Sequence, residues 1–311
     1  MRRWLLLAVL LAGCGEEARA PVVEGRLSGA SAERTCAAGG DFWPTMVLAR
    51  SDGMTWVACK EQSRVLASDG ASVALDGPPI ALLAASDALW ALDVNGTLYR
   101  IEDGRIASRS DLDLQAPYNL WEGAGALWAA DDRAGEVVRI DQGGAVQARI
   151  AVGDGPADMA FDGETAWVVN HRDRGLVRIE QDRARRLATL AGDAPERVAL
   201  LDGALWVTGR GTDLLRVDPR SGRVLETVEI GGGGIDVVAA GGALWVPARS
   251  EAVDATGFPT MDALRRVIPG GAATVVARPR ARTDVHGLIA DEDGVWLADT
   301  TAGFVYRFRN P

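Results

Sequence analysis

The sequence predicts an all-β protein, a seven-bladed β-propeller in which the N-terminal strand closes the last blade. The first observation is a repeat of seven tryptophans in similar apolar contexts, spaced by 34 to 51 residues: Trp56, Trp90, Trp128, Trp167, Trp206, Trp245 and Trp296. A spacing of about 40 residues is typical of a four-stranded propeller blade. The repeat runs through residues 22–311 without a visible domain boundary, so one domain is expected.

Each repeat has the same internal order, which is the second observation. An apolar first strand such as 158–161 leads into an Asp-Gly turn such as Asp162-Gly163, and the tryptophan strand follows. A third strand, as in 137–140, and a fourth, as in 225–230, complete the unit. Asp-Gly between apolar runs is a strong hairpin signal. The strands are apolar on both faces, which is expected where each blade packs between two neighbours.

The ends of the sequence provide the third observation. The last repeat has strands at 287–290, 295–298 and 304–308, and the sequence then contains no fourth strand. The segment Val22–Leu27 alternates apolar and polar residues ahead of the first complete repeat. Pairing this segment with the last repeat would remove an exposed sheet edge.

Charged residues also recur with the repeat. An arginine occupies the third strand and an aspartate follows the tryptophan by three residues, and ion pairs within or between blades are the expected use of these residues. The members are Arg100, Arg139, Arg178, Arg216 and Arg307, and Asp93, Asp131 and Asp299.

The N-terminal segment predicts export. Arg2 and Arg3 precede an apolar run that is too short to span a bilayer, and Leu11-Ala12-Gly13-Cys14 matches the lipobox of bacterial lipoproteins. Residues 1–13 are therefore expected to be a lipoprotein signal peptide, and residues 14–21 a tether lipidated at Cys14; an ordinary signal peptide with a chance cysteine is the alternative. The predicted location is the cell envelope, anchored by lipid alone: the outer membrane and periplasm in a Gram-negative cell, or the outer face of the cytoplasmic membrane in a Gram-positive one.

Composition limits the partners. Loss of Arg2 and Arg3 with the signal peptide changes the net charge from −10 to −12, which argues against nucleic acid. Cys36 and Cys59 map to one face of the propeller, and an oxidising compartment favours a disulfide between them. No run of histidine and cysteine has metal-ligand spacing, so no metal site is expected.

The candidate site lies where the repeats differ. These differences fall at the start of the first strands and between the second and third strands, which emerge on the same face. The predicted ligand-binding residues are Tyr118, Asn119, Asp158, His171, Arg197, Arg210 and Asp236. The sixth repeat carries an insertion at about Arg249–Ala263, which contains Phe258 and Met261 and is expected to be an exposed irregular loop. Such an insertion marks a binding face or is a tolerated surface loop.

The repeat resembles the propellers of streptogramin B (virginiamycin B) lyases and related YVTN and NHL-type repeats. The resemblance covers residues 40–311 at repeat level, and its best local match is Asp284-Val285-His286-Gly287-Leu288. It implies a magnesium-associated role for Asp284 and an acid/base role for His286 in opening a cyclic depsipeptide by elimination. The second histidine of the lyases is missing, because the sixth repeat reads Gly234-Ile235-Asp236.

Two functions remain open at this point. The first is a monomeric, non-catalytic propeller at the cell envelope that binds a protein or a small molecule and needs no cofactor. The alternative is a lyase or lactonase acting on a small cyclic ester, with His286 as acid/base, Asp284 beside it and magnesium as the cofactor. The fold alone cannot decide between them.

Overall fold

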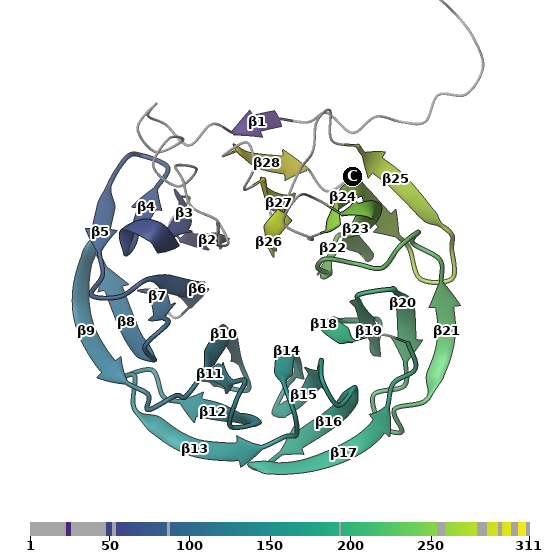
Figure 1. Cartoon of the computed structure of the whole chain (residues 1–311), viewed down its shortest axis with the longest axis horizontal. Helices are drawn as coiled ribbons and strands as arrows, with labels where there is room; N and C mark the ends of the chain where they lie inside the picture. The colour runs from purple at the N-terminus through teal and green to yellow at the C-terminus, as the bar shows by residue number, and fades with distance from the viewer. Residues whose placement is uncertain are drawn as a thin grey trace, which may run out of the picture.

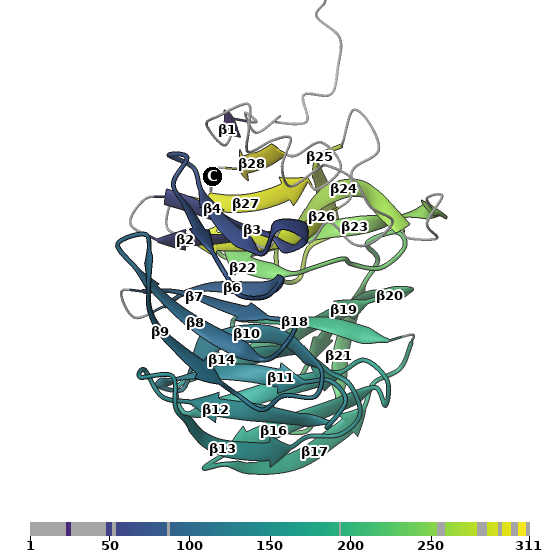
Figure 2. The ribbon, with the colours of Figure 1, turned by 60° about the vertical axis from the view of Figure 1, so that its left-hand side comes forward.

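The computed structural model describes residues 23–25, 48–51, 54–85, 88–192, 194–253, 259–278, 285–291, 294–299 and 304–308. These residues form seven four-stranded antiparallel sheets arranged as blades around a common axis (Figure 1). Figure 2 shows the ring obliquely, with the strands of successive blades following one another around it. The predicted seven-bladed propeller is confirmed.

The two inner strands of each blade carry the repeat. The innermost strands are β2 (Leu48–Ser51), β6 (Pro79–Ala85), β10 (Pro117–Gly123), β14 (Pro156–Asp162), β18 (Pro195–Leu201), β22 (Val238–Ala240) and β26 (Val285–Asp291). The tryptophan strands are β3 (Met54–Cys59), β7 (Ala88–Asp93), β11 (Ala126–Asp131), β15 (Thr165–Asn170), β19 (Ala204–Gly209), β23 (Ala243–Val253) and β27 (Gly294–Asp299).

The two outer strands complete each blade. The third strands are β4 (Arg64–Ala67), β8 (Thr97–Glu102), β12 (Glu136–Ile140), β16 (Gly175–Glu180), β20 (Thr212–Val217), β24 (Pro259–Val267) and β28 (Phe304–Phe308). The outermost strands are β5 (Ser72–Ala74), β9 (Arg105–Asp111), β13 (Val146–Ala151), β17 (Arg183–Thr189), β21 (Val224–Val228), β25 (Ala273–Ala277) and β1 (Val23–Gly25). A short 3₁₀ helix, Lys60–Gln62, joins β3 to β4. No helix in the described ranges has the length and apolarity needed to cross a membrane.

The N-terminal strand closes the ring as the sequence predicts. In Figure 1 β1 lies on the outer side of β28, and Val23, Glu24 and Gly25 pair antiparallel with Arg307, Tyr306 and Val305. The seventh blade is therefore built from both ends of the described chain, in the order β1-β28-β27-β26. Its outer strand covers an edge that would otherwise be open.

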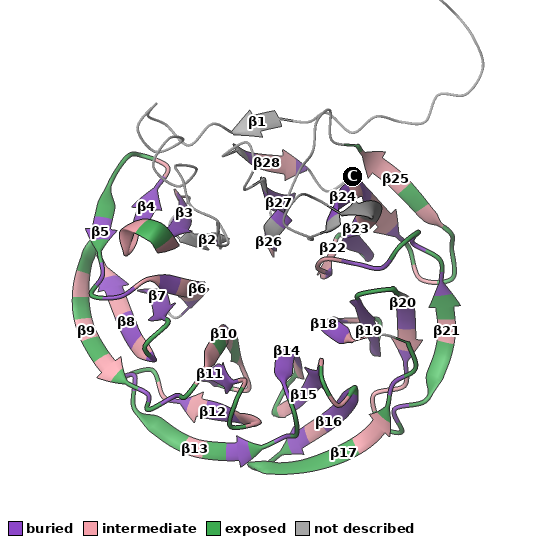
Figure 3. Cartoon of the chain, in the orientation of Figure 1, coloured by how far each residue is buried: buried purple, intermediate pink, exposed green. Residues whose placement is uncertain are grey.

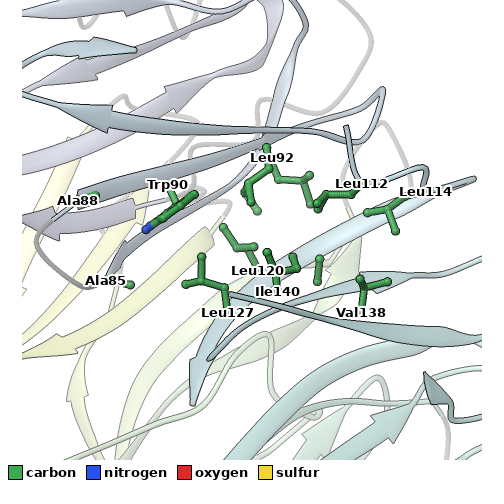
Figure 4. Close-up of a cluster of buried hydrophobic side chains, with 13 residues drawn as sticks. Ala85, Ala88, Trp90, Leu92, Leu112, Leu114, Leu120, Leu127, Val138 and Ile140 are labelled. Carbon is green, nitrogen blue, oxygen red and sulfur yellow. The ribbon is translucent and has the colours of Figure 1, made fainter. Parts of the chain in front are cut away.

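The core lies between neighbouring blades. The seven repeat tryptophans are at most 8% exposed, and Trp90 packs against Leu120, Leu127 and Ile140 of the third blade (Figure 4). Figure 3 shows burial concentrated on the second and third strands, with most exposed residues on the outermost strands.

Two-residue hairpins join the inner strands; Asp202 and Gly203 have φ of 50° and 67°, as a type I′ turn requires.

The recurring arginines form ion pairs, but not with the expected aspartates. In register each arginine faces a tryptophan, and Arg216 and Arg307 lie over their rings at 5.9 and 5.0 Å. Arg100 pairs with Glu102 within its blade, while Arg139 pairs with Asp182 of the next blade. Asp93 and Asp131 instead accept hydrogen bonds from backbone N–H groups, because a buried carboxylate can satisfy several donors of a tight connection. The side chain of Asp299 lies outside the described part.

The expectation of an irregular loop in the sixth repeat was wrong. Residues 249–253 and 259–263, the described part of the insertion, extend β23 and β24 into a longer antiparallel pair, in which Arg249 is opposite Met261. Met261 is 8% exposed because it packs with Trp245 and Leu264 rather than facing solvent. Phe258 lies outside the described residues.

Candidate functional site

Four inner strands open with the same backbone feature. Pro79, Pro117, Pro156 and Pro195 begin β6, β10, β14 and β18, and each is followed by a shift of register against the tryptophan strand. Proline lacks the N–H that a ladder needs, so it suits the first position of a strand, and a bulge after it turns the next side chains toward a different direction. Through these bulges Tyr118, Asp158 and Arg197 come together at one end of the ring axis.

Arg197 is the centre of this group, which we call the axial cluster (Tyr118, Asp158, Glu196, Arg197 and Asp236). Its Nε lies 3.6 Å from Oδ1 of Asp236, and its Nη1 donates to the carbonyl oxygen of Glu196 at 2.8 Å. Burial opposes the charge, but the nearby Tyr118 oxygen and the carboxylates of Asp236 and Asp158 outweigh it and hold the pKa of Arg197 above its usual range. The guanidinium is therefore permanently charged. The side chain of Arg197 is 24% exposed.

Asp158 links three blades. Its Oδ1 accepts from Nε1 of Trp121 at 2.7 Å and from the Met159 N–H at 2.9 Å, and its Oδ2 accepts from the Val198 N–H at 2.8 Å. The residue is 8% exposed. Burial raises the pKa of Asp158, and Arg197 and the hydrogen bonds oppose that rise. Asp158 thus ties its own strand to the blades on both sides, and its charge lies near Arg197.

Asp236 makes a similar contact between the sixth and seventh blades. It accepts hydrogen bonds from the Val237 N–H at 2.8 Å and from the Leu288 N–H of the seventh blade. Burial raises the pKa of Asp236 to about 6, with the charge of Asp158 adding to the shift and Arg197 opposing it. Its side chain is 22% exposed, so its protonation can respond to the solvent.

This raised pKa predicts a pH-dependent stability. The folded chain binds a proton at Asp236 more tightly than the unfolded chain, whose aspartates titrate at about 3.9, so the contribution of Asp236 to stability falls as the pH rises from about 4 to about 6. Asp236→Asn should remove this loss, and its free energy of unfolding relative to wild type should increase over that interval.

Denaturant titrations at several pH values measure the difference. Asp218→Asn is the matched control, because hydrogen bonds from the N–H groups of Ser221 and Arg220 lower the pKa of Asp218 and its contribution is lost as the pH falls. A pH-independent difference between Asp236→Asn and wild type would show that Asp236 is not protonated near pH 6.

Glu196 and Arg249 complete the site, and neither was predicted from the sequence. Glu196, 8% exposed, accepts from Nε of Arg210 and from Nη2 of Arg249, both at 2.7 Å. Arg249 also donates through Nε to the Gly234 carbonyl at 3.1 Å. A signal for Glu196 existed, because it follows the opening residue of its strand as Tyr118 and His286 do. Arg249 is the first residue of the insertion in the sixth repeat, but its contact with Glu196 depends on how the sixth blade packs against the fifth.

Tyr118 and His171 form an aromatic pair beside Arg197. Their ring centroids are 6.3 Å apart, and Tyr118 is 38% exposed. Burial lowers the pKa of His171, although Asp132, whose Oδ1 is 3.8 Å from Nδ1, opposes the shift. His171 is therefore neutral at pH 7. Gly155 lies against the His171 ring. It has φ of +75°, and a Cβ at this position would lie 2.9 Å from Cε1 of His171, too close without a shift of the ring.

The other predicted residues are placed as follows. Arg210 is 63% exposed and reaches the cluster through Glu196. Asn119 accepts from the N–H of Leu120 at 2.9 Å. His286 belongs to β26, but its side chain lies outside the described part, as do Asp284, Cys14 and Cys36. Cys59 is 2% exposed at the end of β3, and its disulfide with Cys36 stays a prediction. The described residues contain no group of three His, Cys, Asp or Glu side chains placed to hold a metal ion.

Comparisons with known proteins place the chain by fold. No protein-family model and no curated protein matches its sequence. Virginiamycin B lyase from Staphylococcus aureus is similar in structure with a TM-score of 0.71 and 17% identity, covering 87% of this chain and 96% of that one.

A streptogramin B lyase structure gives a TM-score of 0.71 at 14% identity, over 94% and 98% of the two chains. BamB from Moraxella catarrhalis gives 0.59 at 12% identity, over 85% and 83%. The chain therefore shares its propeller fold with streptogramin B lyases and other β-propellers.

Proposed function

We propose that the protein is a non-catalytic binding module, anchored by lipid to the outer side of a bacterial membrane, and that the axial cluster is its binding surface. The observation that carries this proposal is Arg197, a half-buried and permanently charged guanidinium next to the exposed ring of Tyr118. Arginine and tyrosine are the side chains that most often dominate binding energy at protein interfaces. The ligand is an envelope protein or a small molecule.

The electrostatics of the cluster favour binding over proton transfer. Arg197 and Arg249 are each held by a carboxylate, and Asp158 is fully engaged with donors from three blades. Preorganised charges of this kind bind without a further ordering cost. Proton transfer instead needs an acid or base within reach of the substrate with a pKa near the working pH. The carboxylate of Asp236, whose pKa is raised to about 6, is already engaged by the N–H groups of Val237 and Leu288 and lies beside Arg197.

The location rests on the sequence of the first 21 residues, which lies outside the described part. The lipobox at Leu11–Cys14 predicts lipidation, and a doubly acylated cysteine binds a membrane stably. The structural likeness to BamB and to a WD40 propeller domain of Doa1 supports a binding role at the level of fold only.

Site-specific photocrosslinking in intact cells tests the binding surface. A photoreactive phenylalanine analogue at Tyr118 should give a discrete adduct of defined mass, because this side chain borders Arg197 and is exposed. The same analogue at Val224, which is 37% exposed on the outer strand β21, is the control and should give none. Arg197→Gln should reduce the adduct at Tyr118 by about tenfold, the loss expected for one charged hydrogen bond. Equal labelling at both positions would refute the proposal.

A second function, a lyase acting on a cyclic ester, is favoured by the likeness to virginiamycin B lyases, one of which was solved catalytically inactive with quinupristin. We expect no ring opening of quinupristin by this protein, with or without magnesium, because the second lyase histidine is missing from the sequence. Mass spectrometry of quinupristin after incubation measures the outcome. Ring opening that is lost with chelator and with His286→Ala would establish the lyase.

A further inference from the structure

A large cavity lies between the fifth and sixth blades. Its volume is about 920 Å³, and it is lined by residues of β20, β21 and β24 together with the glycine run 231–233. A second cavity of about 410 Å³ adjoins it and shares Thr227, Glu229, Gly231 and Arg265. Small-molecule sites commonly measure about 300–1,000 Å³, so the first cavity has room for a ligand. Arg249 borders it, but its guanidinium is engaged by Glu196 and Gly234.

The cavity coincides with a departure from the repeat. On the third strand of each blade, one residue lies opposite the repeat tryptophan. The residue just before it on the same strand points into the core between neighbouring blades. In the first five blades this residue is apolar or tyrosine and at most 8% exposed: Leu66, Tyr99, Val138, Val177 and Leu215. In the sixth blade it is Arg265, opposite Val246. An arginine thus stands where the fold ordinarily buries a hydrophobic side chain.

Arg265 is poorly compensated. Its side chain is 17% exposed, and its Nε is buried without a hydrogen-bond partner among the described residues. Its Nη2 lies 3.7 Å from Oδ2 of Asp262, while both carboxylate oxygens of Asp262 lie 2.9 Å from Nη1 of Arg278. The third-strand arginines Arg100 and Arg216 share the lone Nε but lie over tryptophan rings. A half-buried charge whose nearest carboxylate is 3.7 Å away and shared with Arg278 is incompletely compensated, and an anionic ligand group would complete it.

Beside Arg265 the cavity is lined by the backbone of the glycine run 231–233. The N–H groups of Gly231 and Gly232 have no acceptor in the described part of the chain. Gly231 has φ of +69°, and a Cβ there would lie 3.1 Å from Nη2 of Arg265. Gly231, Gly232 and Arg265 line the same cavity, and a guanidinium together with adjacent peptide N–H groups is a donor set that captures a carboxylate.

The rim of the cavity carries the opposite charge. Glu229 is exposed and has no ion-pair partner in the described ranges, and Asp213 accepts only the Ile230 N–H at 3.2 Å. These carboxylates disfavour a polyanion and favour a ligand that also carries a positive group. We propose that the cavity between blades five and six is a second binding site, which takes a short peptide with its C-terminal carboxylate at Arg265, Gly231 and Gly232 and its ammonium group at Glu229 and Asp213.

Calorimetry on the mature protein with trialanine as the probe tests the site. Trialanine should bind, and its C-terminal amide should bind at least about tenfold more weakly, because the amide removes the charge that Arg265 recognises. N-acetyl-trialanine should also bind more weakly, since it lacks the ammonium group. Arg265→Met should weaken trialanine binding by about tenfold or more, whereas Arg197→Gln in the axial cluster should leave it unchanged.

The melting temperature separates a binding role from a structural one. Arg265→Met restores the kind of side chain that the first five blades hold at this place, so we expect it to melt at the wild-type temperature or higher. Absence of trialanine binding to the wild type up to about 10 mM, equal binding of the acid and the amide, or unchanged binding to Arg265→Met would each overturn the proposal. None of these outcomes bears on crosslinking at Tyr118.

Discussion

Starting the chain at residue 29 instead of residue 22 is expected to lower the free energy of unfolding by about 3–6 kcal/mol. This is the contribution of about two buried apolar side chains at about 1.5–3 kcal/mol each. Removing β1 leaves β28 without its outer pairing strand, so the seventh blade has an open edge. Val305 and Phe308 of β28 are 3% and 4% exposed in the intact chain. For a domain of this size the melting temperature should fall by on the order of 10 °C.

The control is the matched truncation of the tether. A chain that starts at residue 22 lacks the tether, residues 14–21, but keeps β1, so it should melt as the full mature chain does. Scanning calorimetry of the two truncated chains and the mature chain, all without the lipid, makes the comparison. If the chain from residue 29 melts as high and as cooperatively as the chain from residue 22, ring closure by β1 contributes nothing to stability.

The second large effect is expected at Asp131. This residue is 1% exposed, and its carboxylate accepts from the N–H groups of Gln115, Ala116, Arg133 and Ala134 at 2.6 to 3.2 Å. It thereby ties the connection before β10 to the connection after β11, on the face that carries the axial cluster. Asp131→Ala leaves four backbone N–H donors without their acceptor. Each such donor costs about 1–3 kcal/mol when water cannot replace the acceptor. Because some donors can reach water, we expect a net loss of about 3–5 kcal/mol.

Chemical denaturation measures the loss, and Asp69→Ala is the control. Asp69 is an exposed turn residue that accepts from the Ala71 N–H, so its removal should cost about 1 kcal/mol or less. Asp131→Asn keeps one acceptor oxygen and should fall between wild type and Asp131→Ala. Similar losses for the alanine variants at positions 69 and 131 would mean that Asp131 does not organise this face.

The candidate site could be predicted in part. Tyr118, Asp158, Arg197 and Asp236 were chosen because they stand at the start of the first strands, and the repeat alone determines that these starts meet at the axis. Glu196 could have been found by the same alignment, one position before Arg197. Arg265 could not, because an arginine at that place has meaning only when its neighbours across the blade interface are known.

The sequence by itself determined the number of blades, the order of their strands and the closure by residues 22–27. These follow from local signals that recur every blade: a tryptophan strand, a tight turn and an apolar period that each unit must bury against the next. Only the tertiary structure decided which charges meet. Asp131 binds backbone N–H groups instead of an arginine, and Glu196 holds Arg249 of the next blade, because partner choice depends on the distances between side chains that the fold brings together from far apart in the chain.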